Sequence, residues 1–135
     1  MQNIFLQYIA VLIPFAIIDG IWLSTMAPRF YQRYIGHLLA ATPNWTVAVV
    51  FYLLYMVGIV ALVVQPSIAQ GHTLLRTLMY GAIFGGIAYA TYDLTNHATM
   101  KDWPAIVTIV DIIWGAILTG SVSLIAVWAL RAFLN

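Results

Sequence analysis

The 135-residue chain contains no cysteine, and charged residues make up only 7% of it. The absence of cysteine excludes a disulfide framework, thiolate metal ligation and thiol redox catalysis. A water-soluble domain normally has charge on about a quarter of its residues. With 64% hydrophobic residues and so little charge, the chain cannot maintain a surface in water. The composition predicts an integral membrane protein, with residues 1–135 forming a single transmembrane domain.

Positive charge is also scarce, because five Lys and Arg residues leave a net charge of only +1. No run of basic residues could follow a phosphate backbone, so we expect no nucleic-acid partner. The first apolar segment also lacks the basic start and the small-residue cleavage site of a signal peptide. We expect it to be retained as a membrane span.

Long apolar segments are what the chain has in abundance. A membrane span needs about 20 predominantly apolar residues at a rise of about 1.5 Å per residue. Four segments meet this requirement: Asn3–Met26, Trp45–Val64, Thr73–Met100 and Pro104–Leu134. The predicted fold is an all-α, antiparallel bundle of four transmembrane helices, with both ends of the chain on one side of the membrane.

The connection between the first two predicted spans, Ala27–Asn44, has a helical pattern of its own. Its basic residues recur every four positions, and each is followed by an apolar or aromatic residue: Arg29, Arg33 and His37, with Phe30, Tyr34 and Leu38. This pattern favours a short helix in the headgroup plane, with its basic side toward water. An ordinary loop with basic residues that anchor it at the membrane surface is an equally weighted alternative.

The third and fourth predicted spans are expected to be antiparallel neighbours. Their connection, Lys101–Trp103, is very short, and Pro104 suits the first position of the following helix. Gly81 and Gly85 form a G-x-x-x-G pair, which lets another helix backbone approach closely.

Three aspartates interrupt these apolar segments: Asp19, Asp93 and Asp111. An ionised side chain at such a position costs about 2.5–3.5 kcal/mol on insertion scales. Each lies seven residues from an end of its span, and the alternating helix directions put all three about 10 Å below the same surface. We therefore expect them to share one polar interior, in which at least one holds a proton or the group binds a cation.

Nearby polar and aromatic residues extend this candidate site. Trp22 and Trp114 each follow an aspartate by three residues, and Asn96 follows Asp93 by three, which places each pair on one helix face. The predicted ligand-binding residues are Asp19, Trp22, Asp93, Asn96, Asp111 and Trp114. The structural alternative is that the aspartates accept hydrogen bonds from Trp22, Trp114, Thr95 or Asn96 and only join the helices. No spacing matches a metal motif, and the sequence indicates no cofactor.

Several strings of residues resemble a bacterial family of small four-span membrane proteins known as domain of unknown function 2177. They cover nearly the whole chain: Asp19–Leu23, Phe51–Tyr55 with Gly58, Gly81–Gly85, Ala88–Asn96, Trp103–Pro104 and Val110–Gly115. The resemblance implies a four-helix protein of the bacterial inner membrane but no particular reaction. Members resembling this chain tend to be encoded near lipid-modifying enzymes, which favours a role in lipid metabolism.

The function predicted from these observations is a carboxylate pocket that opens toward the side of Arg29, Arg33 and Lys101. We expect it to bind or modify a membrane lipid, through the headgroup or a modified acyl chain, or to bind a cation. If the protein is an enzyme, the carboxylates are the proton donor and acceptor. The alternatives are a proton- or cation-coupled carrier, and an accessory subunit of a larger membrane complex. The expected partners are membrane lipids and another membrane protein or a second copy of the chain.

Overall fold

The computed structural model describes residues 3–134 and, within them, contains helices and no strand. The ends of the predicted domain, residues 1–2 and 135, lie outside the described residues. The helices are α1 (Ile4–Met26), α2 (Gln32–Ile35), α3 (Trp45–Ile59), α4 (Gln65–Gln70), α5 (Leu74–Thr99) and α6 (Ala105–Leu134). Two π-helical segments, η1 (Ala27–Tyr31) and η3 (Val60–Val64), and a short 3-10 helix, η2 (Gly36–Leu38), complete the structure.

Capping residues define where three of the helices begin. The side chains of Asn3, Asn44 and Thr73 accept hydrogen bonds from backbone N–H groups in the first turns of α1, α3 and α5. Each contact satisfies a donor that has no partner within its helix. Gly71 ends α4 with a positive φ of 64°, a conformation that glycine adopts at little cost.

The π-helical segments join shorter helices into longer ones. A continuous helical stretch runs from Ile4 to Leu38, and a second runs from Trp45 to Gln70. These two stretches and Ala105–Leu134 are long and apolar enough to cross a membrane. The described residues therefore contain three such helices, which correspond to the first, second and fourth predicted spans. The sequence predicted a break after Met26, whereas the structure continues α1 through η1 into α2.

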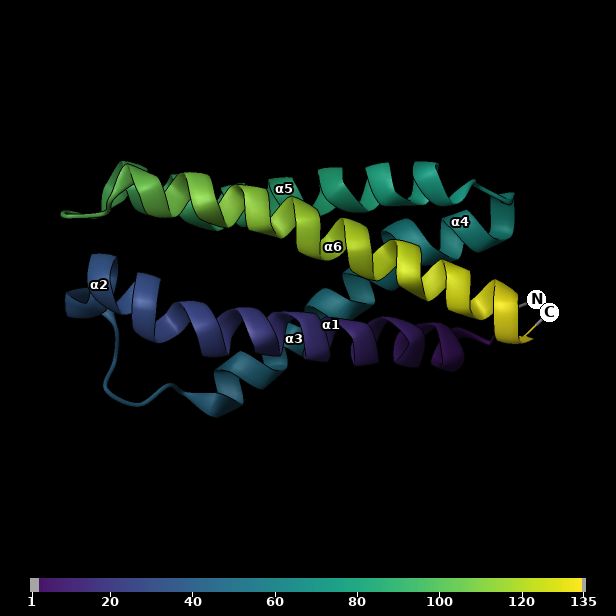
Figure 1. Cartoon of the computed structure of the whole chain (residues 1–135), viewed down its shortest axis with the longest axis horizontal. Coiled ribbons are helices and arrows are strands. Elements are labelled where there is room, and N and C mark those ends of the chain that lie inside the picture. Colours follow the sequence, from purple (N-terminus) through teal and green to yellow (C-terminus); the bar gives the residue numbers. More distant parts are fainter. Residues whose placement is uncertain (1–2, 135) are drawn as a thin grey trace.

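Helix α6 lies at the centre of the fold. It packs against α5 along one side and against α1 along another, while α3 crosses α1 obliquely (Figure 1). The start of α1 and the end of α6 lie at the same end of the molecule, and the turn between α5 and α6 lies at the opposite end (Figure 1). The main apolar core combines residues from α1, α3 and α6, with Val11, Met56 and Leu118 fully buried.

The contact between α5 and α6 depends on glycine. A methyl group added at Gly81 would lie 2.8 Å from the backbone oxygen of Thr119, closer than real Cβ atoms come to a neighbour. One added at Gly85 would meet the backbone oxygen of Gly115 and lie 2.6 Å from Oγ1 of Thr119. The two backbones therefore approach as the G-x-x-x-G pair predicted.

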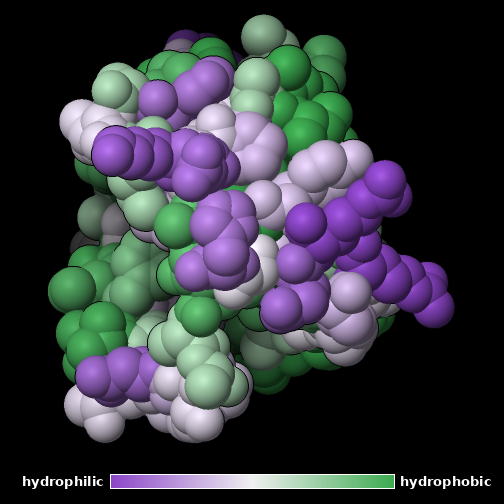
Figure 2. Space-filling view, turned by 90° about the vertical axis from the view of Figure 1, so that its left-hand side faces the viewer, coloured by the Kyte–Doolittle hydropathy of each residue, from purple (hydrophilic) through white to green (hydrophobic). Residues whose placement is uncertain are grey.

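Hydrophilic residues gather on the end of the molecule that carries α2 and the α5–α6 turn, while much of the surface around that end is hydrophobic (Figure 2). The exposed charged and polar residues of these segments are Arg29, Gln32, Arg33, His37, Lys101 and Asp102. Large apolar side chains such as Ile17, Leu54 and Ile113 are more than half exposed along the helices. A polar end and apolar sides are the surface expected of a protein surrounded by lipid.

Candidate functional site

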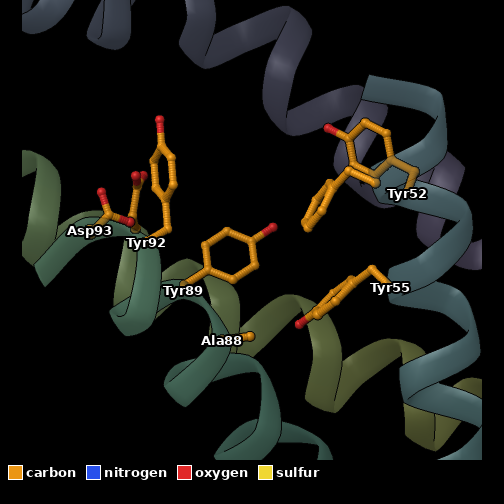
Figure 3. Close-up of a pocket in the computed structure, with 8 residues that line it drawn as sticks. Tyr52, Tyr55, Ala88, Tyr89, Tyr92 and Asp93 are labelled. Atoms are coloured by element: carbon orange, nitrogen blue, oxygen red, sulfur yellow. The ribbon is translucent and has the colours of Figure 1, made fainter. Parts of the chain in front are cut away.

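A cavity of about 330 Å³ lies where the first half of α3 stands apart from α5. Its walls come from α3, α5 and α6, and the close-up shows side chains from two facing helices pointing into the space between them (Figure 3). The residues that line it are Phe51, Tyr52, Tyr55, Ala88, Tyr89, Tyr92, Asp93 and Asp111. The cavity therefore combines an aromatic wall with two carboxyl groups.

Tyrosines spaced three residues apart form most of the aromatic wall. Tyr52 and Tyr55 come from α3, and Tyr89 and Tyr92 come from α5, so each pair occupies one face of its helix (Figure 3). The ring of Tyr55 stacks on Phe84 with 5.6 Å between the ring centres, and its hydroxyl lies 2.7 Å from Oγ1 of Thr119. These contacts fix the base of the cavity to both α5 and α6.

The two carboxyl groups that line the cavity, Asp93 and Asp111, lie close enough to interact directly. The Asp93 side chain is 0% exposed, and neither of its carboxylate oxygens accepts a hydrogen bond from a described residue. Asp111 accepts a hydrogen bond from the Tyr31 hydroxyl, which η1 carries to α6 from the end of α1. Because the two carboxyl groups lie within hydrogen-bonding reach of each other, one proton held between them gives Asp93 a partner in Asp111.

Asp19 is buried beside the cavity but is not among the residues that line it. Its two carboxylate oxygens accept hydrogen bonds from the Tyr52 hydroxyl at 3.2 Å and from the Trp114 indole N–H at 3.3 Å. Asp19 therefore has the neutral donors that the structural alternative requires, whereas the partner of Asp93 is the Asp111 carboxyl group. Tyr52 connects it to the cavity, because its ring forms part of the wall.

The tryptophan pairing differs from the one predicted by the spacing. Trp114 donates to Asp19 on a different helix, and Trp22 donates to the Tyr31 hydroxyl at 3.2 Å. The two indole rings stack with 4.1 Å between their centres and 6° between their planes. Proximity along the helix was thus a poor guide, because Trp114 donates across the interface to α1, while Trp22 donates further along its own helical stretch, to Tyr31 of η1.

The predicted ligand-binding residues are brought together only in part. Asp93 and Asp111 meet in the cavity, and Asp19, Trp22 and Trp114 form an adjoining network around Tyr31 and Tyr52. Asn96 is half-buried beside Tyr92 and does not line the cavity. Arg29, Arg33 and Lys101, toward which the pocket was expected to open, are not lining residues either.

The arrangement also bears on metal binding. Among residues 3–134, no three side chains of His, Cys, Asp or Glu lie close enough together to hold a metal ion. Asp93 and Asp111 supply two carboxyl groups at the cavity, and the remaining lining residues supply only tyrosine hydroxyls as side-chain oxygen atoms. The chemistry of the cavity is therefore that of carboxyl groups facing aromatic rings.

Sequence reasoning missed the tyrosines, and it placed no predicted ligand-binding residue in the second span, Trp45–Val64. The structure shows that Tyr52 and Tyr55 of that span line the cavity, and that Tyr31 of the first connection reaches Asp111. A signal was available in the sequence, because Tyr52 and Tyr55 repeat the three-residue spacing of Tyr89 and Tyr92. What the sequence does not indicate is that the two pairs face each other.

An all-helical fold with apolar helices around a small polar interior defines the class of integral membrane proteins. The chain belongs to the family described as predicted membrane protein (DUF2177), which it matches over residues 4–128. This confirms the family that the sequence motifs resemble. Comparison with curated proteins gives no match. Comparison with solved structures gives none either.

Proposed function

We propose that the chain crosses the bacterial inner membrane four times. In this proposal α5, which is third in chain order, spans the membrane together with the three long apolar helical stretches. Helix α5 has 26 residues, a length of about 39 Å that exceeds the roughly 30 Å hydrocarbon core. It packs along the apolar helix α6, so that a membrane surrounding α6 also surrounds α5. Its acidic residue, Asp93, is buried away from the outer surface, which reduces the cost of a polar residue in this helix.

The basic segment after Met26 would then lie at the membrane surface. Arg29, Arg33 and His37 are exposed at the polar end of the molecule (Figure 2). The Arg33 guanidinium lies 5.4 Å from the centre of the Tyr34 ring, an arrangement that suits the boundary between headgroups and hydrocarbon. We propose that η1 and α2 form an interfacial extension of the first span.

The cavity of this bundle is proposed to receive part of a membrane lipid. The observation that carries this proposal is the position of the cavity between α3 and α5, with Phe51 52% and Tyr92 61% exposed among its lining residues. A cavity bordered by exposed side chains of two neighbouring helices is open to the side of the bundle, which faces lipid in the proposed arrangement. Its volume is at the lower end of the range for small-ligand sites, so it suits a headgroup or an acyl segment.

The carboxyl groups support a binding role over a purely structural one. Asp93 is fully buried, and its hydrogen-bonding partner is a second carboxyl group, that of Asp111. Two acids buried side by side with no basic residue among the lining side chains destabilise the fold unless something else stabilises them. Ionisable residues inside membrane proteins usually serve function. A lipid group with hydrogen-bond donors would supply donors to this pair.

Filling the cavity tests this proposal. Ala88 is a small residue in the cavity wall, and Ala88→Trp would occupy the space without removing a carboxyl group. Ala129 lines a shallow apolar groove formed by α1 and α6 on another part of the surface, so Ala129→Trp is the matched control. We expect mass spectrometry of the lipids retained by the purified protein to show a bound lipid in the wild type and in Ala129→Trp. Most of it should be lost from Ala88→Trp.

Equal retention of the same lipid by the two tryptophan variants would overturn the proposal. So would a wild-type protein that retains no lipid above the level found in empty detergent micelles. Both variants should first be shown to elute as the wild type does on size-exclusion chromatography.

A second candidate is a proton-coupled carrier, which needs polar groups in the far half of the bundle. The Gln7 and Gln65 side chains share a hydrogen bond of 2.5 Å there, and Gln7 is fully buried. The Gln7 Oε1 and Ser123 Oγ atoms are buried and lack hydrogen-bond partners among the described residues. Proteoliposomes containing a pH-sensitive dye test this candidate, because proton flux should fall when Asp19, Asp93 and Asp111 are all replaced by Asn. Flux that is unchanged in the triple variant would exclude it.

A further inference from the structure

The charge of the cavity narrows the chemistry of its occupant. Asp93 and Asp111 are the charged residues that line it, and no lysine, arginine or histidine is among the lining residues. In a medium of low dielectric constant, uncompensated negative charge repels phosphate and carboxylate groups and attracts cations. The carboxyl end of the cavity is therefore unsuited to an anionic group.

The hydrogen-bonding capacity of the two carboxyl groups further narrows the chemistry of the occupant. Asp111 accepts a hydrogen bond from Tyr31, and Asp93 and Asp111 lie within hydrogen-bonding reach of each other. One proton held between the two carboxyl groups leaves one negative charge on the pair, and their remaining oxygen lone pairs need donors. A primary ammonium group carries three donors and a positive charge, and its hydrogen bonds to a carboxylate are about twice as strong as neutral ones.

The aromatic wall suits the same group. Five rings line the cavity beside the carboxyl groups, from Phe51, Tyr52, Tyr55, Tyr89 and Tyr92 (Figure 3). The face of an aromatic ring attracts a cation within about 6 Å of its centre, and cages of such rings recognise ammonium groups. Carbon atoms next to the nitrogen would pack against the same rings, which an inorganic cation cannot do.

We propose that the cavity binds the primary ammonium group of an amphiphile, as in a lipid with an aminoalkyl headgroup. This inference rests on the proposed function and specifies the lipid class. The ammonium nitrogen lies against Asp111, which is backed by the enclosed Asp93, the adjoining carbons lie between the tyrosine rings, and the rest of the molecule leaves between α3 and α5. A phosphate in the same headgroup stays outside, away from the two carboxyl groups.

Two probes that differ only in the polar group test the inference. Dodecylamine, which is protonated at pH 7, and uncharged dodecanol are titrated separately into the full chain in a non-ionic detergent. Binding is followed by the change in intrinsic tyrosine and tryptophan fluorescence and by the shift in Tm. We expect the ammonium probe to bind wild-type protein about tenfold more tightly than the alcohol, a difference of about 1.4 kcal/mol.

Variants separate this inference from the function on which it rests. Asp93→Asn leaves the charge of Asp111 in place and should reduce the preference for the amine, whereas replacing both aspartates by Asn should abolish it and leave dodecanol binding unchanged. Tyr92→Leu removes an exposed ring of the wall, carries little risk to folding, and should reduce the preference about threefold. Ala88→Trp should weaken both probes, whereas Ala129→Trp should weaken neither.

The outcomes are distinguishable. Equal affinity of the two probes for the wild type, or an unchanged preference in both Asp93→Asn and Tyr92→Leu, would overturn the ammonium assignment and leave the lipid cavity intact. Failure of Ala88→Trp to weaken either probe would instead overturn the cavity as a lipid site.

Discussion

Two successive parts of one face of helix α5 make opposite kinds of contact. In the first part, Gly81 and Gly85 bring the backbones of α5 and α6 close enough that even a methyl group has no room. About one to two turns further along the same face, Tyr89 and Tyr92 project into a cavity of about 330 Å³ (Figure 3). The difference teaches that side-chain size along one helix face determines where the helix packs closely and where it leaves space.

The close contact between α5 and α6 at Gly85 also positions the cavity. The close approach at Gly85 fixes α5 against α6, and Asp93 and Asp111 come from these two helices. A rigid contact is required there, because two carboxyl groups are held together without a basic residue among the lining side chains. The cavity can therefore be functional only while the contact between α5 and α6 is intact.

The largest expected effect comes from breaking the tight contact. Gly85→Ala places a methyl group against the backbone oxygen of Gly115, which cannot move without shifting α6. We expect a loss of about 2–3 kcal/mol in stability, measured as a lower Tm and a smaller folded fraction in detergent. At Gly86 the added methyl group would lie 3.7 Å from the Ala116 Cβ, an ordinary contact. Gly86→Ala should therefore be neutral or stabilising, and an equal loss in both variants would contradict this account.

A smaller effect, a gain in stability, is expected from a substitution at Asp93 beside the cavity. Asp93→Asn replaces one of two buried acids that lie within hydrogen-bonding reach of each other by an amide that can donate to Asp111 without holding a proton between them. We expect the ligand-free protein to gain about 1 kcal/mol in unfolding free energy. Asp102→Asn is the matched control, because Asp102 is exposed at a positive φ of 62°, which asparagine tolerates. A decrease in stability for Asp93→Asn would mean that the pair of carboxyl groups itself stabilises the fold.

A substitution in the hydrogen-bond network around Asp19, beside the cavity, should lower the unfolding free energy by a comparable amount. Trp114→Phe keeps an aromatic ring near Trp22 and removes the N–H donor to Asp19. We expect a loss of about 1 kcal/mol, and the same substitution in Asp19→Asn should cost less because the two residues are coupled. The exposed Trp128 provides the control through Trp128→Phe. Strictly additive losses in the double variant would show that the hydrogen bond contributes nothing.

The smallest effect is expected where α3 approaches α5 beyond the cavity. A methyl group added at Gly58 would lie 3.2 Å from the Cζ atom of Phe84, at the far end of a ring that can shift slightly. Gly58→Ala should change the unfolding free energy by less than about 1 kcal/mol, as measured by thermal unfolding beside Gly85→Ala. A loss as large as that of Gly85→Ala would show that α3 and α5 are also in rigid contact.

The sequence indicated most of the helices because their signals are local. Apolar length predicted α1, α3 and α6, and the short Lys101–Trp103 connection predicted that α5 and α6 are neighbours. The G-x-x-x-G pair also indicated the correct contact, because small residues three and four positions apart face one neighbour. The continuation of α1 beyond Met26 was missed because the apolar run ends there, whereas a π-helical turn that includes Pro28 keeps the helix continuous.

The site was predicted less completely because it depends on how helices are rotated about their axes. The depths of Asp93 and Asp111 were enough to indicate that they meet. Depth alone did not indicate that Asp19 would turn toward Trp114 and Tyr52, or that Asn96 would lie beside Tyr92. Rotation is determined by packing between distant segments, here the stacked rings of Trp22 and Trp114, and spacing within one helix carries no information about it.

The fit between Tyr89 and Gly115 has a consequence for how relatives of this chain can vary. A methyl group at position 115 would overlap the Tyr89 ring and would also lie 2.7 Å from the backbone oxygen of Gly85, so it needs both the loss of the ring and a wider spacing of α5 and α6. Relatives that gain bulk at 115 should have lost the ring at 89 and separated the two helices. The two positions, 26 apart along the chain, are therefore expected to change together during evolution, and each exchange would reshape the hollow beside them.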